Sequence, residues 1–167
     1  MLGMDLSFLS DLLRVFADAI PRPVMVRTDE RLVEFRFGRW PRVLGPGWYL
    51  EIPLIATYES HFVTDQFVEN QQRFGHNVYR YSVRFAITDA LLFATRTYDD
   101  ASLVADVTEI QFSQALLEHD SDLEQISKAV HEAIKEELKE FGIDVRNFQI
   151  SGHSKADFCL SVWELSQ

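Results

Sequence analysis

The sequence predicts an α+β fold, in which an antiparallel, mostly N-terminal sheet is packed by two or more helices. Three observations support this class. Runs with the alternation of strands fill the first half of the chain, and two segments with helical periodicity follow them. The length of 167 residues suits one domain that buries its own core. We divide the chain into an amphipathic helix over residues 1–20, a domain over residues 21–152 and a short tail over residues 153–167.

Residues 1–20 predict an amphipathic helix that ends before Pro21, because proline cannot continue a helix. Asp11, Arg14 and Asp18 make the segment too polar to span a membrane. Its apolar face therefore lies either in a membrane interface or against protein, and the acidic residues of its polar face disfavour anionic lipid. The residues expected in this membrane or subunit contact recur at spacings of four and three: Leu2, Leu6, Leu9, Leu13, Phe16 and Ile20.

Strand patterns and turn residues alternate in the next part of the chain. Glycine permits backbone angles closed to other residues, and proline presets a turn or ends a strand because it lacks an N–H group. The turn-marking residues are Gly38, Gly45, Pro46, Gly47 and Pro53. The predicted strands are Val24–Arg27 and Leu32–Phe37, joined as a hairpin at Asp29-Glu30, then Trp48–Ile52, Thr57–Phe67 and Asn77–Ile87.

Two helices are predicted after residue 99. The first begins after Asp99 or Asp100 and runs to about Leu117. The second starts at the capping box Ser121-Asp122-Leu123-Glu124 and ends at Gly142. In the tail, alternating apolar residues predict a short strand that can pair with a sheet edge. The residues expected on one side of the first helix are Leu103, Val107, Ile110 and Gln114, and those of the tail strand are Phe158, Leu160 and Val162.

The charge balance argues against nucleic-acid binding. With 16 Lys and Arg against 26 Asp and Glu, the net charge is −10, which repels phosphates. Pro21–Arg42 is an exception, with six arginines and three acidic residues. This segment either faces anionic headgroups or is a solvated strand edge that its charge keeps from pairing. The single cysteine excludes an internal disulfide framework and fits a reducing compartment, so we expect a cytoplasmic location.

No motif in the sequence predicts catalysis, so we expect no enzymatic activity, no metal and no cofactor. The five histidines are scattered without ligand spacing, and no glycine-rich phosphate loop is present. Cys159 lies in an apolar tail and is better explained as a small buried hydrophobe than as a nucleophile. Three aromatic residues near the Gly-Pro-Gly turn form either a lipid-facing cluster or part of the core: Trp40, Trp48 and Tyr49.

Three segments occur in an order that identifies a family resemblance. They are Phe37–Ile55 with its Gly-Pro-Gly turn and Ile52-Pro53, Tyr81–Asp89 with its closing Ile-Thr-Asp, and Phe141–Ile150, where a glycine precedes alternating apolar residues. Together they resemble the SPFH domain, the band-7 module shared by stomatins, prohibitins and flotillins, from about Val24 to Gly152. Members of that family generally carry a long coiled coil after the domain. The sequence resembles a short member without one.

The resemblance implies a non-enzymatic, homo-oligomeric scaffold that associates with a membrane or organises partner proteins such as a protease. The alternative is a soluble structural subunit of a ring, shell or virion, which uses the same fold without lipid. The amphipathic N-terminus, the basic segment and the aromatics favour the scaffold. The expected lack of a coiled coil and the acidic face of the second predicted helix, over Glu132–Glu140, favour the subunit. In either case we expect the chain at the membrane periphery or within a large assembly.

Overall fold

The computed structural model describes residues 10, 20–53, 55–97, 100–119 and 122–155. The predicted tail strand and nearly all of the predicted N-terminal helix lie outside these residues. The described chain forms two compact units. The first unit comprises the described residues up to Thr64 together with those of Ala86–Tyr98, and the second comprises Asp65–Phe85 and the described residues from Asp99 onward.

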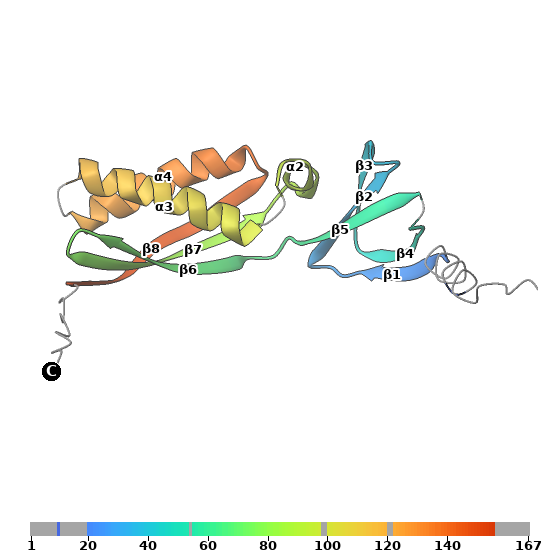
Figure 1. The fold of residues 1–167 in the computed structure, drawn as a ribbon, viewed down its shortest axis with the longest axis horizontal. Coiled ribbons are helices and arrows are strands. Elements are labelled where there is room, and N and C mark those ends of the chain that lie inside the picture. The colour runs from blue at the N-terminus through green and yellow to red at the C-terminus, as the bar shows by residue number, and fades with distance from the viewer. Residues whose placement is uncertain (1–9, 11–19, 54, 98–99, 120–121, 156–167) are drawn as a thin grey trace, which may run out of the picture. The chain divides into compact units, whose positions relative to one another are not determined.

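The first unit contains two small antiparallel sheets and one helix (Figure 1). Its strands are β1 (Arg22–Val26), β2 (Glu30–Arg36), β3 (Trp40–Leu44), β4 (Gly47–Glu51) and β5 (Ala56–Phe62). β1 pairs with β4, and β2 lies between β3 and β5. Helix α2 (Ala90–Arg96) packs against β2 and β3. The sequence analysis missed this helix, whose signal is Asp89, an N-cap that accepts from the N–H groups of Leu91 and Leu92.

The predicted hairpin between the first two strands is wrong. β1 pairs with β4, which places Met25 opposite Trp48, whereas β2 pairs with β3 and β5. The reason lies in the tight turn after β2, where Phe37 and Gly38 both have positive φ, 51° and 66°. The Arg39 N–H closes this turn on the Arg36 carbonyl at 3.0 Å. A turn of this hand matches the twist of two paired strands, so β2 forms its hairpin with β3.

Residues 40–44 form strand β3, which was missing from the strands predicted from the sequence. Pro41 has no N–H to donate, but β3 is the edge strand of its sheet, and a missing donor is tolerated there. The predicted strand Thr57–Phe67 is also corrected. It divides into β5 and a second strand that begins at Gln66, because residues 63–65 leave the ladder.

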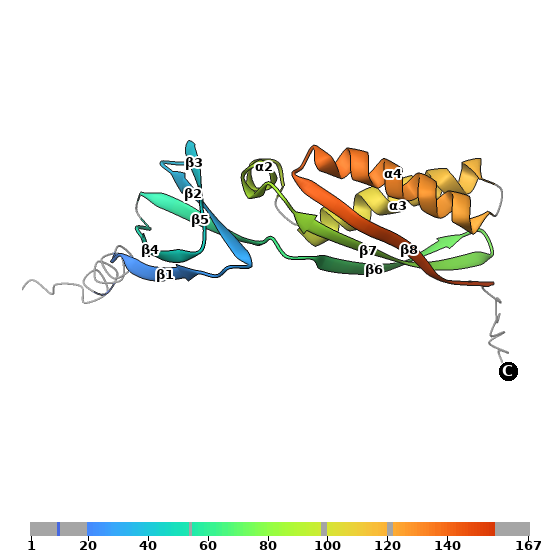
Figure 2. The ribbon, with the colours of Figure 1, turned by 180° about the vertical axis from the view of Figure 1, so that it is seen from behind.

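The second unit is a three-stranded sheet with two helices on one face (Figures 1 and 2). The strand order is β6-β7-β8, and the core lies between the sheet and the helices. Phe112 sits at its centre, with ring centroids 5.1 Å from Tyr81 and 6.0 Å from Phe148. The antiparallel sheets and their helices confirm the predicted α+β class. The elements are β6 (Gln66–Phe74), β7 (Asn77–Ile87), α3 (Asp100–Glu118), α4 (Leu123–Lys139) and β8 (Ile143–Lys155).

The two long helices are found where they were expected, with two corrections. The N-cap of α4 is Asp122, whose carboxylate accepts from two N–H groups, so the predicted capping box begins one residue too early; Ser121 lies outside the described residues. Gly142 ends the helix as predicted, with φ at 76°. Of the four residues predicted on one side of α3, Val107 is buried and Leu103 is half-buried, whereas Ile110 and Gln114 are exposed. α3 has apolar residues on two sides, so its periodicity alone does not select the core face.

Candidate functional site

The β1–β4 ribbon of the first unit has two chemically similar faces with different surroundings. Val24, Val26 and Tyr49 point inward, where they pack with Leu32 and Leu44. The outward face is also apolar, although alternation in a half-buried ribbon normally places polar residues there. We call it the apolar ribbon face, and its members are Pro23, Met25, Trp48 and Leu50.

The strand register makes the apolar ribbon face continuous. Met25 lies opposite Trp48, and Pro23 lies opposite Leu50. The exposed fractions are 52% for Met25, 73% for Trp48 and 57% for Leu50. Single exposed apolar residues are common on protein surfaces, but contiguous ones mark surfaces that contact a partner or a membrane. The ribbon therefore presents a continuous, exposed apolar surface.

Two arginines stand at the ends of strand β1. Arg22 is its first residue and Arg27 follows its last, and both are exposed. They place positive charge at both ends of the apolar strand, in a chain whose overall charge is −10. Apolar side chains bordered by arginines form a pattern suited to the boundary between headgroups and acyl chains of an anionic membrane.

A buried carboxylate ties the ribbon to the neighbouring sheet. Glu34 on β2 is 4% exposed, and its Oε1 accepts from Arg36 Nε at 3.1 Å and from the Tyr58 hydroxyl at 3.2 Å. Arg42 Nη2 lies 3.1 Å from Oε2. The Tyr58 oxygen in turn accepts from the Ile52 N–H, one residue after β4, at 3.2 Å. This Glu34 network links four strand segments and holds the end of the ribbon in place.

The turn-marking residues predicted from the sequence all lie in turns or at strand ends of the first unit. Gly38 is in the β2–β3 turn, Gly45 and Pro46 join β3 to β4, and Pro53 lies in the turn after β4. Gly47 begins β4 with φ at 152°, in the region that favours glycine. These residues shape the turns of the unit, and the exposed apolar side chains come from its strands.

The structure separates the predicted interface aromatics. Trp48 belongs to the apolar ribbon face, whereas Tyr49 points inward and is half-buried against the core. The structure does not describe the side chain of Trp40. Of the predicted N-terminal contact residues, Ile20 is described and is exposed two residues before β1. The others lie outside the described residues: Leu2, Leu6, Leu9, Leu13 and Phe16.

Sequence reasoning missed the other members of this face, Pro23, Met25 and Leu50. The available signal was the alternation within β1 and β4, which places positions 23, 25, 48 and 50 on one side once the two strands are paired. Because the first strand was predicted to pair with the second, these four positions were not recognised as neighbours. In the described part of the chain, no helix is long and apolar enough to cross a membrane. No cluster of His, Cys, Asp and Glu suited to a metal occurs among those residues either.

Comparison with known proteins assigns the chain to a family. No curated protein matched it. The family model described as the SPFH domain / Band 7 family matches residues 24–152. This match spans all eight described strands except the ends of β1 and β8, together with all three described helices. Because the match covers most of its 167 residues, the chain belongs to the SPFH domain / Band 7 family.

Proposed function

We propose that this protein is a non-enzymatic scaffold of the SPFH type that binds the surface of anionic membranes through the apolar ribbon face. The observation that carries the proposal is the continuous exposed set of Met25, Trp48, Leu50 and Pro23, with arginines at both ends of β1. Membership in the SPFH family supports a scaffold role. Nothing in the site suggests bond-making chemistry.

The energetics favour shallow insertion of this face. Fully burying a side chain the size of Met25 or Leu50 is worth about 1.5–3 kcal/mol. A basic residue near an anionic surface adds about 1 kcal/mol, and Arg22 and Arg27 are placed to do so. Trp48 suits the boundary itself, because its ring is apolar and its indole N–H is polar. Several such contributions are enough for reversible binding without a membrane-spanning segment.

Vesicle flotation tests the proposal. The full chain should float with vesicles of phosphatidylcholine and phosphatidylserine, and less with phosphatidylcholine alone. The variant M25S/W48S/L50S should lose at least about tenfold in partitioning, because it removes most of the buried apolar area. The matched control is F62S/L123S, which removes two exposed apolar side chains that lie outside the ribbon. Full flotation of the triple variant, or no flotation of the intact chain, would contradict the proposal.

The second candidate function is a soluble structural subunit, in which a neighbouring copy covers the apolar ribbon face. It is favoured by the ribbon's having only two strands, since such a sheet is marginal without further packing. In this case the chain assembles in lipid-free buffer, and M25S/W48S/L50S lowers the mass of the assembly. Light scattering of the triple variant in the absence of lipid separates the two candidates, because the mass falls only if a neighbouring copy covers the ribbon.

A further inference from the structure

Met25 carries a sulfur atom within the apolar ribbon face. Its side chain is 52% exposed, and it lies opposite the exposed Trp48 in the strand register. Val24 and Val26, its neighbours on β1, point inward and leave the Met25 thioether accessible from outside. The chain contains three methionines and one cysteine, and Met25 is the one sulfur-containing residue in the part that the structure describes.

Methionine differs in its redox chemistry from the other members of this face. A thioether is oxidised to a sulfoxide, and methionine sulfoxide reductases reverse the reaction. The side chains of Pro23, Trp48 and Leu50 have no reversible reaction of this kind. The sulfoxide is polar, whereas the thioether is apolar and flexible. Met25 is therefore the member of the apolar ribbon face whose polarity a reversible reaction can change.

We propose that Met25 is a reversible oxidation site, and that its oxidation releases the ribbon from the membrane. In the reaction, a lone pair of the Met25 sulfur attacks one oxygen of hydrogen peroxide or of an organic hydroperoxide. An S–O bond forms as the O–O bond breaks. The sulfur loses two electrons, and the peroxide is reduced to water or to an alcohol. This role rests on the proposed membrane binding, and it adds a means of controlling that contact.

The outward position of Met25 makes the oxidation act on binding and not on folding. In the bound state this side chain lies in the apolar boundary of the bilayer, where a sulfoxide oxygen loses its hydrogen bonds to water. In the free protein the same oxygen faces water, because the side chain is exposed. The reaction changes no charge, so Arg22 and Arg27 remain positive. Oxidation therefore destabilises the bound state and leaves the folded unit intact.

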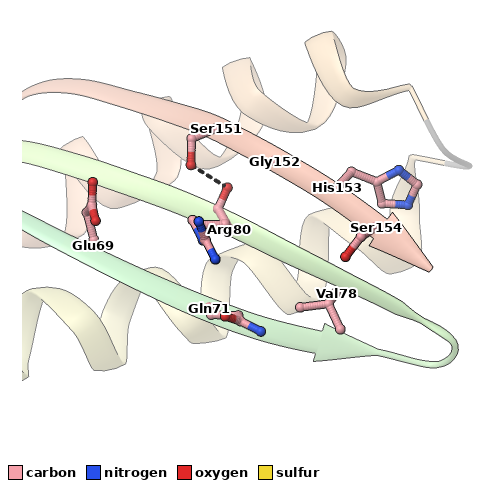
Figure 3. A pocket seen from close by; sticks show the side chains of 8 residues that line it. All are labelled: Glu69, Gln71, Val78, Arg80, Ser151, Gly152, His153 and Ser154. Carbon is pink, nitrogen blue, oxygen red and sulfur yellow. Dashed lines mark hydrogen bonds between the residues drawn. The ribbon is translucent and has the colours of Figure 1, made fainter. Parts of the chain in front are cut away.

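The sheet of the second unit carries a surface that the same reaction leaves unchanged. Figure 3 shows the hollow of about 470 Å³ on this sheet, whose lining includes Glu69, Gln71, Arg80 and His153. None of the residues that line it contains sulfur. Among the described residues, the effect of a hydroperoxide is therefore expected at the ribbon of the first unit.

Treatment of the full chain with hydrogen peroxide, followed by vesicle flotation, tests the proposal. Mass spectrometry measures the oxidation in the tryptic peptide 15–27, which contains Met25 and no other methionine. The oxidised chain should lose about fivefold or more in partitioning to vesicles of phosphatidylcholine and phosphatidylserine, because an apolar side chain of the contact has become polar. A mixture of the two methionine sulfoxide reductases, one for each sulfoxide epimer, should restore flotation.

Two variants assign the effect to Met25, and each is compared with its own untreated sample. M25L has no sulfur at this position but retains Trp48 and Cys159, so peroxide should not change its flotation. M1L/M4L removes the other two methionines and should respond to peroxide like the unaltered chain. Circular dichroism before and after treatment should show the same folded state.

Several outcomes would overturn the role of Met25. They are a failure of Met25 to oxidise, full flotation of the oxidised chain, loss of flotation by treated M25L, and unfolding of the oxidised chain. Each of them leaves the membrane proposal standing if the untreated chain floats. An untreated chain that does not float contradicts the membrane proposal, and the role of Met25 in membrane release is then lost with it.

Discussion

The two units differ in the kind of core that they enclose. The second unit has an aromatic core in which Phe112 contacts Tyr81 and Phe148. The first unit has a small core of aliphatic residues such as Leu32 and Leu44, yet it exposes Met25 and Trp48 on its ribbon. The apolar content of a segment therefore does not show by itself whether the segment belongs to the core of this protein. Apolar residues form the cores of both units, and in the first unit they also form an exposed face of the ribbon.

The largest expected effect is on the aromatic core of the second unit. Phe112→Ala should lower the free energy of unfolding by about 3–5 kcal/mol, because Phe112 is fully buried between Tyr81 and Phe148. Urea denaturation followed by circular dichroism measures this loss. The control, Trp48→Ala, removes a larger ring from an exposed position and should cost much less. Equal losses would break the comparison, since they would place Trp48 in a packed core.

A smaller effect is expected in the first unit, where a buried charge supplements a small core. Glu34→Ala should lower the free energy of unfolding by about 2–3 kcal/mol, because it leaves the Tyr58 hydroxyl and two arginines without their shared acceptor. Arg36 and Arg42 are half exposed, so water can solvate them and limits the loss. Thermal unfolding measures it. Glu59→Ala, at an exposed position on β5, is the control, and a loss as large as that of Glu34→Ala would contradict the role of the network.

The smallest expected effect is a dependence of stability on alkaline pH, caused by Tyr81 in the core of the second unit. Burial, assisted by the charge of Glu109, raises the pKa of Tyr81 to about 12. This value lies above the ordinary 10, so the folded state retains a proton that the unfolded state releases. The contribution of Tyr81 to stability is therefore complete below about pH 10. It falls by at most about 1.4 kcal/mol per pH unit from there to about pH 12.

Denaturation at several alkaline pH values checks this slope. Tyr81→Phe keeps the ring in the core and removes the titrating hydroxyl, so the slope should decrease in this variant. An unchanged slope would show that Tyr81 is not the group responsible. It would also contradict the burial of the Tyr81 hydroxyl in the core of the second unit.

Local patterns predicted much of the fold. The α4 helix was recognised from its apolar stripe and from Gly142, whose positive φ ends it. Strand β7 was placed at its observed bounds, Asn77–Ile87. The turn at Pro46-Gly47 was found because glycine and proline have backbone preferences of their own. Each of these features depends on residues that are close together in the chain, so the sequence alone contains the necessary information.

The candidate site was less predictable, because it depends on pairing between distant strands. Trp48 was singled out as an aromatic near a turn, but Met25 and Leu50 joined it only when β1 paired with β4. On α3, Val107 and Ile110 were placed on one side, yet Val107 is buried and Ile110 is exposed, because the helix has apolar residues on two sides. Which side packs inward was decided by the neighbouring aromatic residues, not by its own periodicity.

The sequence by itself determined the class of fold, the family and most of the regular elements, since these follow from local periodicity, turn chemistry and motif order. Tertiary structure alone decided which apolar residues became core and which became surface. A strand has two faces and a helix has several sides, and the chain cannot bury them all. Which face becomes buried depends on which elements, distant in the sequence, pack against it. In this protein that packing left one ribbon face apolar and exposed.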